Sequence, residues 1–187
     1  MNIVIFGPPG AGKGTQAKNL EKKLNYFQVS TGDMLRDEIK KDTEIGRKII
    51  DCMNEGKFVD DAIVNKLIKK VVFDPQKKDR LIFDGYPRTI EQVKNLDLFL
   101  AASNQKIDFI FFLNVNKDTI IKRIERRKIL EKRSDDDINT ILKRYDTYME
   151  TTRSVLDYYS TKSNFKEIDG GLEIAEITSK ISDILKV

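Results

Sequence analysis

The chain has 187 residues, of which 40% are hydrophobic and 34% are charged, as is typical of one soluble α/β domain with a sizeable core. Histidine is absent, which excludes histidine general bases, serine–histidine triads and histidine metal sites, and the single cysteine excludes internal disulfides and cysteine-cluster zinc sites. The net charge of +4 is a weak indication of nucleic-acid binding, and no apolar stretch approaches the roughly 20 residues of a membrane span.

The first predicted element is a strand over residues 3–6, and its early start leaves no room for a signal peptide, which favours a cytoplasmic protein. The glycine-rich stretch GPPGAGKGT follows at residues 7–15 and leads into a helical pattern. Its glycines let the backbone turn around an anion, while the helix dipole and Lys13 add positive charge. The stretch departs from the standard phosphate-loop pattern, because Gly14 stands at the Ser/Thr position and the hydroxyl follows at Thr15. It predicts a cradle for a nucleoside triphosphate; the alternative is a glycine turn without a ligand.

Residues 30–73 hold mostly amphipathic helical patterns with no strong strand, which predicts a helical insertion. The insertion opens with STGDMLR at residues 30–36, a turn into a helix with Arg36 one turn in. By itself this stretch is a routine helix cap.

Beyond and around the insertion the chain alternates between strand-like and helical patterns. Apolar strand-like runs recur at residues 81–83, 109–113 and, more weakly, 165–168. Helical patterns lie between them, for example at residues 16–24 and 90–100, and an apolar stripe at helical spacing ends the chain. This alternation predicts a parallel sheet with helices on both faces.

A second candidate site is the sequence DGYPRT at residues 84–89, directly after a predicted strand. An aspartate at the carboxyl end of a parallel strand lies where open α/β sheets bind ligands. Asp84 would therefore hold Mg²⁺ beside the glycine stretch, mostly through water, although Asp-Gly and Tyr-Pro also simply make a turn. The planar fork of donors on Arg88 suits bidentate recognition of phosphate oxygens.

A basic cluster lies between residues 122 and 133. Its members are Lys122, Arg123, Arg126, Arg127, Lys128, Lys132 and Arg133. Ser134 and three aspartates after it supply an N-cap and an acidic first turn for a helix over residues 135–160. We therefore expect the cluster to form a short exposed loop.

Taken in order, these motifs closely resemble those of the adenylate kinase family, in its short-lid form, over essentially the whole chain. The resemblance implies an α/β fold of the P-loop NTPase type, in which helices flank a parallel five-stranded sheet. Within this single kinase domain, residues 30–59 would form a helical NMP-binding subdomain and residues 127–133 a short lid, with the remainder as the core. The expected lid lacks the usual glycines, and its residues 128–132 also suit a helix.

The resemblance further implies reversible phosphoryl transfer from MgATP to AMP, with Mg²⁺ as the cofactor and no zinc. The expected partners are the small nucleotides ATP, AMP and ADP, without nucleic acid or membrane, and the expected state is a monomer. The lid arginines would neutralise the transferring group, and Arg123 would stack on the donor adenine. No general base is evident.

Site residues carry over from the family motif by motif. Catalysis would fall to Lys13, Arg88, Arg123, Arg133 and Arg144. ATP would contact Gly10, Ala11, Gly12, Lys13, Gly14, Thr15, Arg123, Arg127, Gly171 and Leu172. AMP would contact Thr31, Arg36, Lys57, Val59, Gly85, Arg88, Gln92, Arg133 and Arg144. Mg²⁺ would lie near Thr15 and Asp84.

Three alternatives remain to be compared with this assignment. A UMP/CMP kinase on the same scaffold is disfavoured by Thr31, Thr89 and Gln92, since a glutamine amide offers the donor and acceptor that pair with adenine. A P-loop switch without kinase activity would need Asp-x-x-Gly and Asn-Lys-x-Asp, and the sequence contains neither. A nucleic-acid-binding protein is disfavoured by the small net charge. The donor base is left open between ATP and GTP.

Overall fold

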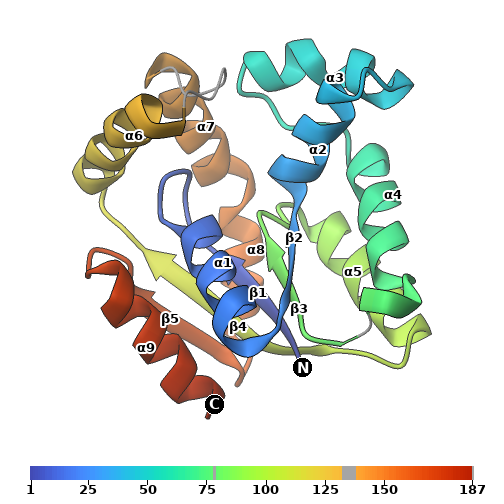
Figure 1. Ribbon diagram of the computed structural model, residues 1–187, viewed down its shortest axis with the longest axis vertical. Coiled ribbons are helices and arrows are strands. Elements are labelled where there is room, and N and C mark those ends of the chain that lie inside the picture. The colour runs from blue at the N-terminus through green and yellow to red at the C-terminus, as the bar shows by residue number, and fades with distance from the viewer. Residues whose placement is uncertain (78, 132–137, 187) are drawn as a thin grey trace.

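A five-stranded parallel sheet forms the centre of the structure, a computed structural model that describes residues 1–77, 79–131 and 138–186 (Figure 1). The strands are β1 (Asn2–Phe6), β2 (Phe27–Ser30), β3 (Leu81–Asp84), β4 (Ile107–Asn114) and β5 (Phe165–Asp169). Their order is β2-β3-β1-β4-β5, so that Ile3 pairs with Ile82 on one side and with Phe109 on the other. The loop that leaves β1 therefore emerges at the middle of the carboxyl edge of the sheet.

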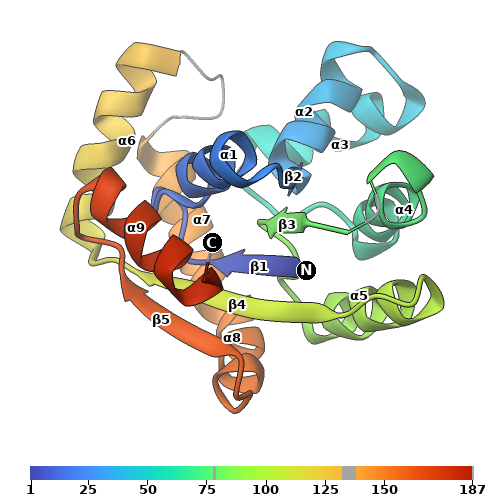
Figure 2. The same ribbon diagram turned by 60° about the horizontal axis from the view of Figure 1, so that its bottom comes forward.

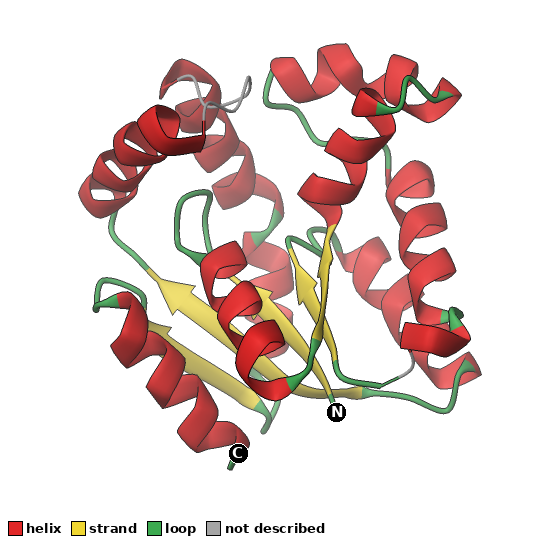
Figure 3. Cartoon of the chain, in the orientation of Figure 1, coloured by secondary structure: helices red, strands yellow, loops and turns green. Residues whose placement is uncertain are grey.

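Helices cover both faces of the sheet (Figure 3). They are α1 (Lys13–Leu24), α2 (Thr31–Lys40), α3 (Glu44–Asn54), α4 (Asp61–Val72), α5 (Ile90–Ala102), α6 (Lys117–Glu131), α7 (Ile138–Thr151), α8 (Arg153–Ser160) and α9 (Ile174–Leu185), with a 3₁₀ turn at Pro75–Lys77. Figure 2 shows α1 and α9 on one face and α5 and α8 on the other. Within the described ranges, no helix is both long enough and apolar enough to cross a membrane.

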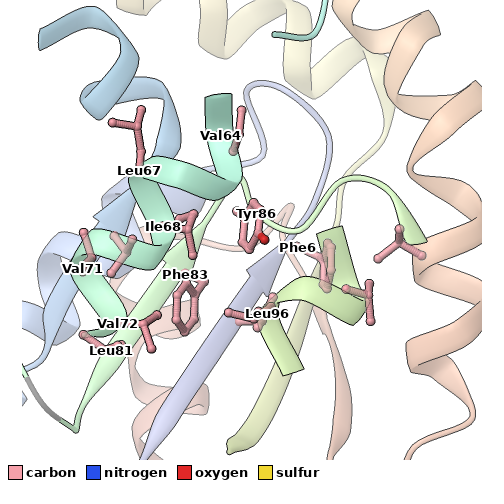
Figure 4. Packing of buried hydrophobic residues seen from close by; sticks show 14 of the residues in the cluster. Phe6, Val64, Leu67, Ile68, Val71, Val72, Leu81, Phe83, Tyr86 and Leu96 are labelled. Atoms are coloured by element: carbon pink, nitrogen blue, oxygen red, sulfur yellow. The ribbon is translucent and has the colours of Figure 1, made fainter. Parts of the chain in front are cut away.

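The side chains of β1 alternate between two hydrophobic cores. Val4 and Phe6 belong to the core beneath α4, α5 and α8, while Ile3 and Ile5 belong to the core beneath α1 and α9. Figure 4 shows the first core, in which Phe6 lies with Phe83 and Tyr86 and with side chains of α4. All five residues of β1 are buried, as in other parallel strands covered on both faces, and each large apolar side chain contributes about 1.5–3 kcal/mol.

The predicted strands at residues 3–6, 81–83, 109–113 and 165–168 are confirmed as β1, β3, β4 and β5. The apolar pattern alone did not reveal β2, although the family resemblance implied a fifth strand. Of its four residues only Val29 is buried, and Gln28 and Ser30 give it a polar sequence. The helical insertion is confirmed as α2, α3 and α4.

The prediction of an exposed loop for the basic cluster is wrong for residues 122–131, which belong to α6. The reason is that α6 contains neither glycine nor proline, and that Ile120 and Ile124, one turn apart, are buried against the core. Residues 132–137 lie outside the described residues, and with them Arg133 and the predicted cap at Ser134. The predicted helix over residues 135–160 consists, where described, of α7 and α8, which meet at Thr152.

Two groups of helices rise beyond the carboxyl edge of the sheet. In Figure 1, α2 and α3 stand on one side of the loop after β1, and α6 and α7 stand on the other. Caps hold the first group in place, since Ser30 Oγ accepts from the Asp33 N–H and Thr43 Oγ1 accepts from the Gly46 N–H. The glycine loop thus lies between two helical walls.

Candidate functional site

The loop between β1 and α1 turns around its own lysine. Gly10 and Gly12 have φ values of 81° and 94°, in the left-handed region that favours glycine. Lys13 begins α1, and its Nζ donates to the carbonyl oxygens of Gly7 at 2.7 Å and Pro8 at 2.9 Å. Because the N-cap residue, Gly12, has no side chain to cap α1, the first-turn N–H groups of the helix are available to an anion.

The surroundings of Lys13 disfavour the charged form of its amine. Burial lowers the pKa of Lys13 from 10.5 to about 8; the carboxylate of Asp84 opposes this, and the cations of Arg88 and Arg127 add to it. A partly buried cation that is repelled by two other cations is stabilised by any anion that enters among them.

Asp84 ends β3 beside this lysine and is 8% exposed. Its Oδ2 accepts a hydrogen bond of 3.0 Å from Gln28 Nε2, on the neighbouring strand β2. Burial raises the pKa of the Asp84 carboxyl, while Lys13 lowers it. A Cβ on Gly14 would lie 3.3 Å from Asp84 Oδ2, so the glycine at the usual Ser/Thr position gives the carboxylate close access to α1.

The turn after β3 carries Arg88 toward the same centre. Arg88 Nε donates to Gly85 O at 2.7 Å, and Thr31 Oγ1 donates to the same oxygen at 3.0 Å. The guanidinium of Arg88 lies 4.8 Å from the centroid of the Phe58 ring. Burial, reinforced by the cation of Arg144, lowers the pKa of Arg88 to about 10.

A pocket opens between the helical insertion and this turn. Its lining consists of Thr31, Leu35, Phe58, Val59, Val64, Gly85, Arg88 and Gln92. Gln92 is 3% exposed, and both ends of its amide are held. Its Oε1 accepts from the Arg88 N–H at 2.7 Å, and its Nε2 donates to Asp61 at 2.5 Å. The lining thus combines an apolar wall with one cation and one amide.

The opposite wall contributes arginines from α6 and α7. Arg123 donates to Ala11 O at 3.3 Å and to Leu172 O at 3.5 Å, and so joins the glycine loop to the loop after β5. Arg127 is half-buried one turn further along α6. Arg144, on α7, donates to Met53 O at 3.1 Å, at the end of α3.

The other expected site residues vary in position. Arg36 lies on α2 and pairs with Asp33 at 2.5 Å. The Lys57 side chain is 72% exposed and pairs with Glu55, so only its backbone is suited to the pocket. Thr15 is exposed on the first turn of α1.

Sequence reasoning did not single out three residues of this site. Gln28 holds Asp84, Phe58 lies under Arg88, and Asp61 holds Gln92. Asp61 looks in the sequence like an ordinary acidic residue at a helix start, so only the spacing of α4 and α5 in space reveals its role.

The arrangement is suited to a polyanion. The charges of Arg88 and Arg127 lower the pKa of Lys13, and that of Arg144 lowers the pKa of Arg88. The buried carboxylate of Asp84 raises the pKa of both Lys13 and Arg88. Such a set can align phosphate groups and neutralise the charge that develops on them.

Comparisons with known proteins agree with this chemistry. The sequence model of the family described as adenylate kinase matches residues 5–164. The chain is similar to the adenylate kinase of Pelagibacter ubique, at 47% identity, and to that of Mycoplasma capricolum, at 40%, over the whole of both chains in each case. The adenylate kinase of Porphyromonas gingivalis is 36% identical over 99% of this chain and 95% of its own. The matches thus include the glycine loop, the turn after β3 and the helices that carry the arginines.

Proposed function

The chain belongs to the adenylate kinase family, and from this premise we propose which of its residues perform the reaction MgATP + AMP ⇌ MgADP + ADP. The enzyme is an ATP:AMP phosphotransferase, so what has to be assigned is the role of each side chain. The single observation that supports the assignment is that the cations of Lys13 and Arg88 both lie near the buried carboxylate of Asp84.

On the donor side, ATP would lie along the glycine loop. The N–H groups of residues 10–15 and Lys13 would bind its β- and γ-phosphates, replacing the carbonyl contacts that Lys13 makes to Gly7 and Pro8. Arg123 joins the glycine loop to Leu172, and this supports a position for the donor adenine between Arg123 and residues 171–172. Backbone contacts and stacking discriminate bases weakly, so GTP remains an alternative donor to be tested.

The residues near Asp84 fit Mg²⁺. Asp84 would supply a buried oxygen ligand, and Thr15 would supply a hydroxyl from the first turn of α1. In the described part of the chain, no group of three or more Asp, Glu or Cys side chains gathers around a possible metal position, and this suits Mg²⁺, which takes one or two protein ligands together with water and phosphate. When bound, the ion would neutralise charge on the β- and γ-phosphates.

On the acceptor side, AMP would occupy the pocket between Thr31 and Gln92. Arg88 and Arg36 would hold its phosphate in line with the donor, and Gln92 would pair with its adenine. The backbone at Lys57 and Val59 and the apolar Phe58 and Val64 would enclose the base. Neither the comparisons nor the pocket favours a pyrimidine acceptor or a switch without kinase activity.

Transfer itself would depend on the arginines. Arg123, Arg144 and, outside the described residues, Arg133 would converge on the transferring phosphoryl group and neutralise its charge. We propose that residues 127–133 act as a short lid and residues 30–59 as the NMP-binding subdomain, so that closure excludes water. We also propose a cytoplasmic monomer whose partners are ATP, AMP and ADP, and not nucleic acid or membrane.

A coupled assay of ADP formation tests this assignment with AMP, CMP, UMP, GMP and dTMP as acceptors beside MgATP. We expect strong turnover with AMP alone, and we expect Arg88→Ala to lower kcat about 10²–10³-fold while the variant stays folded. Faster turnover with CMP or UMP would overturn the acceptor pocket, and near-wild-type turnover of Arg88→Ala would overturn the role of that arginine.

A further inference from the structure

Asp61 joins two helices across the acceptor pocket. It is the first residue of α4, and its carboxylate reaches the start of α5. Its Oδ2 accepts from Thr89 Oγ1 at 2.7 Å, and its Oδ1 accepts from Gln92 Nε2 at 2.5 Å. Thr89 Oγ1 in turn accepts from the Gln92 N–H at 3.1 Å and so caps α5. The carboxylate therefore fixes both the cap of α5 and the amide of Gln92.

The two neighbours of the Gln92 amide determine which way round it lies. A carboxylate can only accept hydrogen bonds, and a backbone N–H can only donate one. The amide oxygen must therefore face the Arg88 N–H, and the amide nitrogen must face Asp61. Rotating the amide by half a turn would bring oxygen against carboxylate and N–H against N–H, and would lose both hydrogen bonds. Gln92 is held in one of its two orientations.

This fixed orientation leaves Gln92 with one specific pattern of hydrogen-bond donor and acceptor for a ligand. After the two protein contacts, Gln92 has one amide hydrogen and one lone pair remaining, and it lines the pocket with Thr31 and Arg88. The adenine of AMP presents an exocyclic amino donor next to a ring-nitrogen acceptor. A 6-oxopurine, such as the base of IMP, presents a carbonyl acceptor next to a ring N–H donor, which is the reverse pattern. Pairing with it would need the amide in its other orientation.

We propose that Asp61 is a positioning residue that locks the Gln92 amide and thereby makes the acceptor site select 6-aminopurine over 6-oxopurine monophosphates. This inference rests on the assignment of Gln92 to the acceptor base. Asp61 acts through Gln92. When Asp61 is removed, water can take the place of its carboxylate; since water both donates and accepts, only the Arg88 N–H then opposes rotation of the amide.

The test compares kcat/KM for AMP and for IMP in wild type, Asp61→Ala and Asp61→Asn. A ratio of two substrates measured on one preparation does not depend on how much of the variant is folded. Asp60→Asn is the matched control, because it removes the same charge one residue away, from an exposed N-cap that contacts Ala62 N–H, and asparagine also caps helices well. Gln92→Leu tests the assignment on which the inference rests.

We expect the AMP:IMP ratio to fall about tenfold or more in Asp61→Ala, as for loss of one hydrogen bond to a charged group. Part of this fall should be a gain in IMP turnover, which damage to the fold would not produce. Asp61→Asn should shift the ratio in the same direction by a smaller factor, Asp60→Asn should leave it unchanged, and KM for ATP should stay constant throughout.

An unchanged ratio in Asp61→Ala, with AMP and IMP turnover lowered equally, would show that Asp61 only docks α4 on α5 and would overturn the inference. If Gln92→Leu also left the ratio unchanged, the proposed role of Gln92 would be wrong as well. If Gln92→Leu lowered the ratio and Asp61→Ala did not, only the role of Asp61 would be refuted.

Discussion

Replacing Lys13 by methionine should abolish activity and yet leave the nucleotide-free enzyme about as stable as the wild type at pH 7. The structure holds the charged amine where burial lowers its pKa from 10.5 to about 8, and such a fall corresponds to about 3 kcal/mol of destabilisation at pH 7. Methionine keeps the apolar stem and removes this cost. It also removes the hydrogen bonds to Gly7 O and Pro8 O, each worth about 1.5 kcal/mol because the donor is charged. The two effects therefore nearly cancel at pH 7.

A difference in stability between the two proteins should develop as the pH rises. Between about pH 8 and pH 10.5 the unfolded lysine binds a proton that the folded one has lost, so the stability of the wild type rises with pH in this window. The slope is at most about 1.4 kcal/mol per pH unit, which gives the wild type about 2 kcal/mol between pH 8 and pH 9.5. The Lys13→Met variant lacks this gain, so it should be about 2 kcal/mol less stable than the wild type at pH 9.5.

Urea unfolding of both proteins at pH 7, 8 and 9.5, without nucleotide, measures this difference. Buried tyrosines also titrate at high pH, but they are common to both proteins and cancel in the comparison. A difference in stability that stays constant from pH 7 to pH 9.5 would refute the claim that the Lys13 charge destabilises the free enzyme.

Two glycine substitutions test close approaches in the structure. In Gly14→Ala the new Cβ lies 3.3 Å from Asp84 Oδ2 and displaces the carboxylate slightly. The Mg²⁺ concentration for half-maximal activity should therefore rise several-fold, while the free energy of unfolding changes by less than about 1 kcal/mol. An unchanged Mg²⁺ titration would show that Gly14 does not affect the metal position. In Gly46→Ala the new Cβ overlaps the Glu38 carbonyl and lies 2.8 Å from Ile39 Cα, so α3 must move away from α2. The free energy of unfolding, measured in urea, should fall by about 1–3 kcal/mol. A loss below about 0.5 kcal/mol would contradict the close packing of the two helices.

The sequence predicts those parts of the fold that produce strong local patterns. Runs such as residues 3–6 and 81–83 are apolar because both faces of the sheet are covered, and this makes them visible without a structure. β2 stays hidden because only Val29 is buried within it. The prediction for α6 was wrong because it relied on local charge. Seven basic residues between 122 and 133 suggested an exposed loop, whereas the burial of two isoleucines favours a helix.

The residues of the candidate site likewise fall into two groups, those that the sequence predicts and those that only the structure reveals. Lys13 and Asp84 lie in motifs whose spacing follows from the phosphate chemistry that we propose for them, and the family resemblance extends this prediction to the arginines. Asp61 and Gln28 act through side chains that are distant in sequence, since Asp61 contacts Thr89 and Gln92 from 28 and 31 residues away and Gln28 contacts Asp84 from 56 residues away. A local sequence pattern cannot predict such a distant partner, because only the packing of the helices and strands brings the two side chains together.

The strand order has a consequence for synthesis on the ribosome. β1 is made first, but its two partners are β3 and β4, which begin at residues 81 and 107. At roughly 5–20 residues per second, the nascent apolar strand waits about 4–16 seconds before its first neighbour exists. During that interval its five residues, all buried in the native sheet, depend on the ribosome or a chaperone for cover. The glycine loop is anchored at the end of β1, so one of the earliest segments to be translated is among the last to take its final shape.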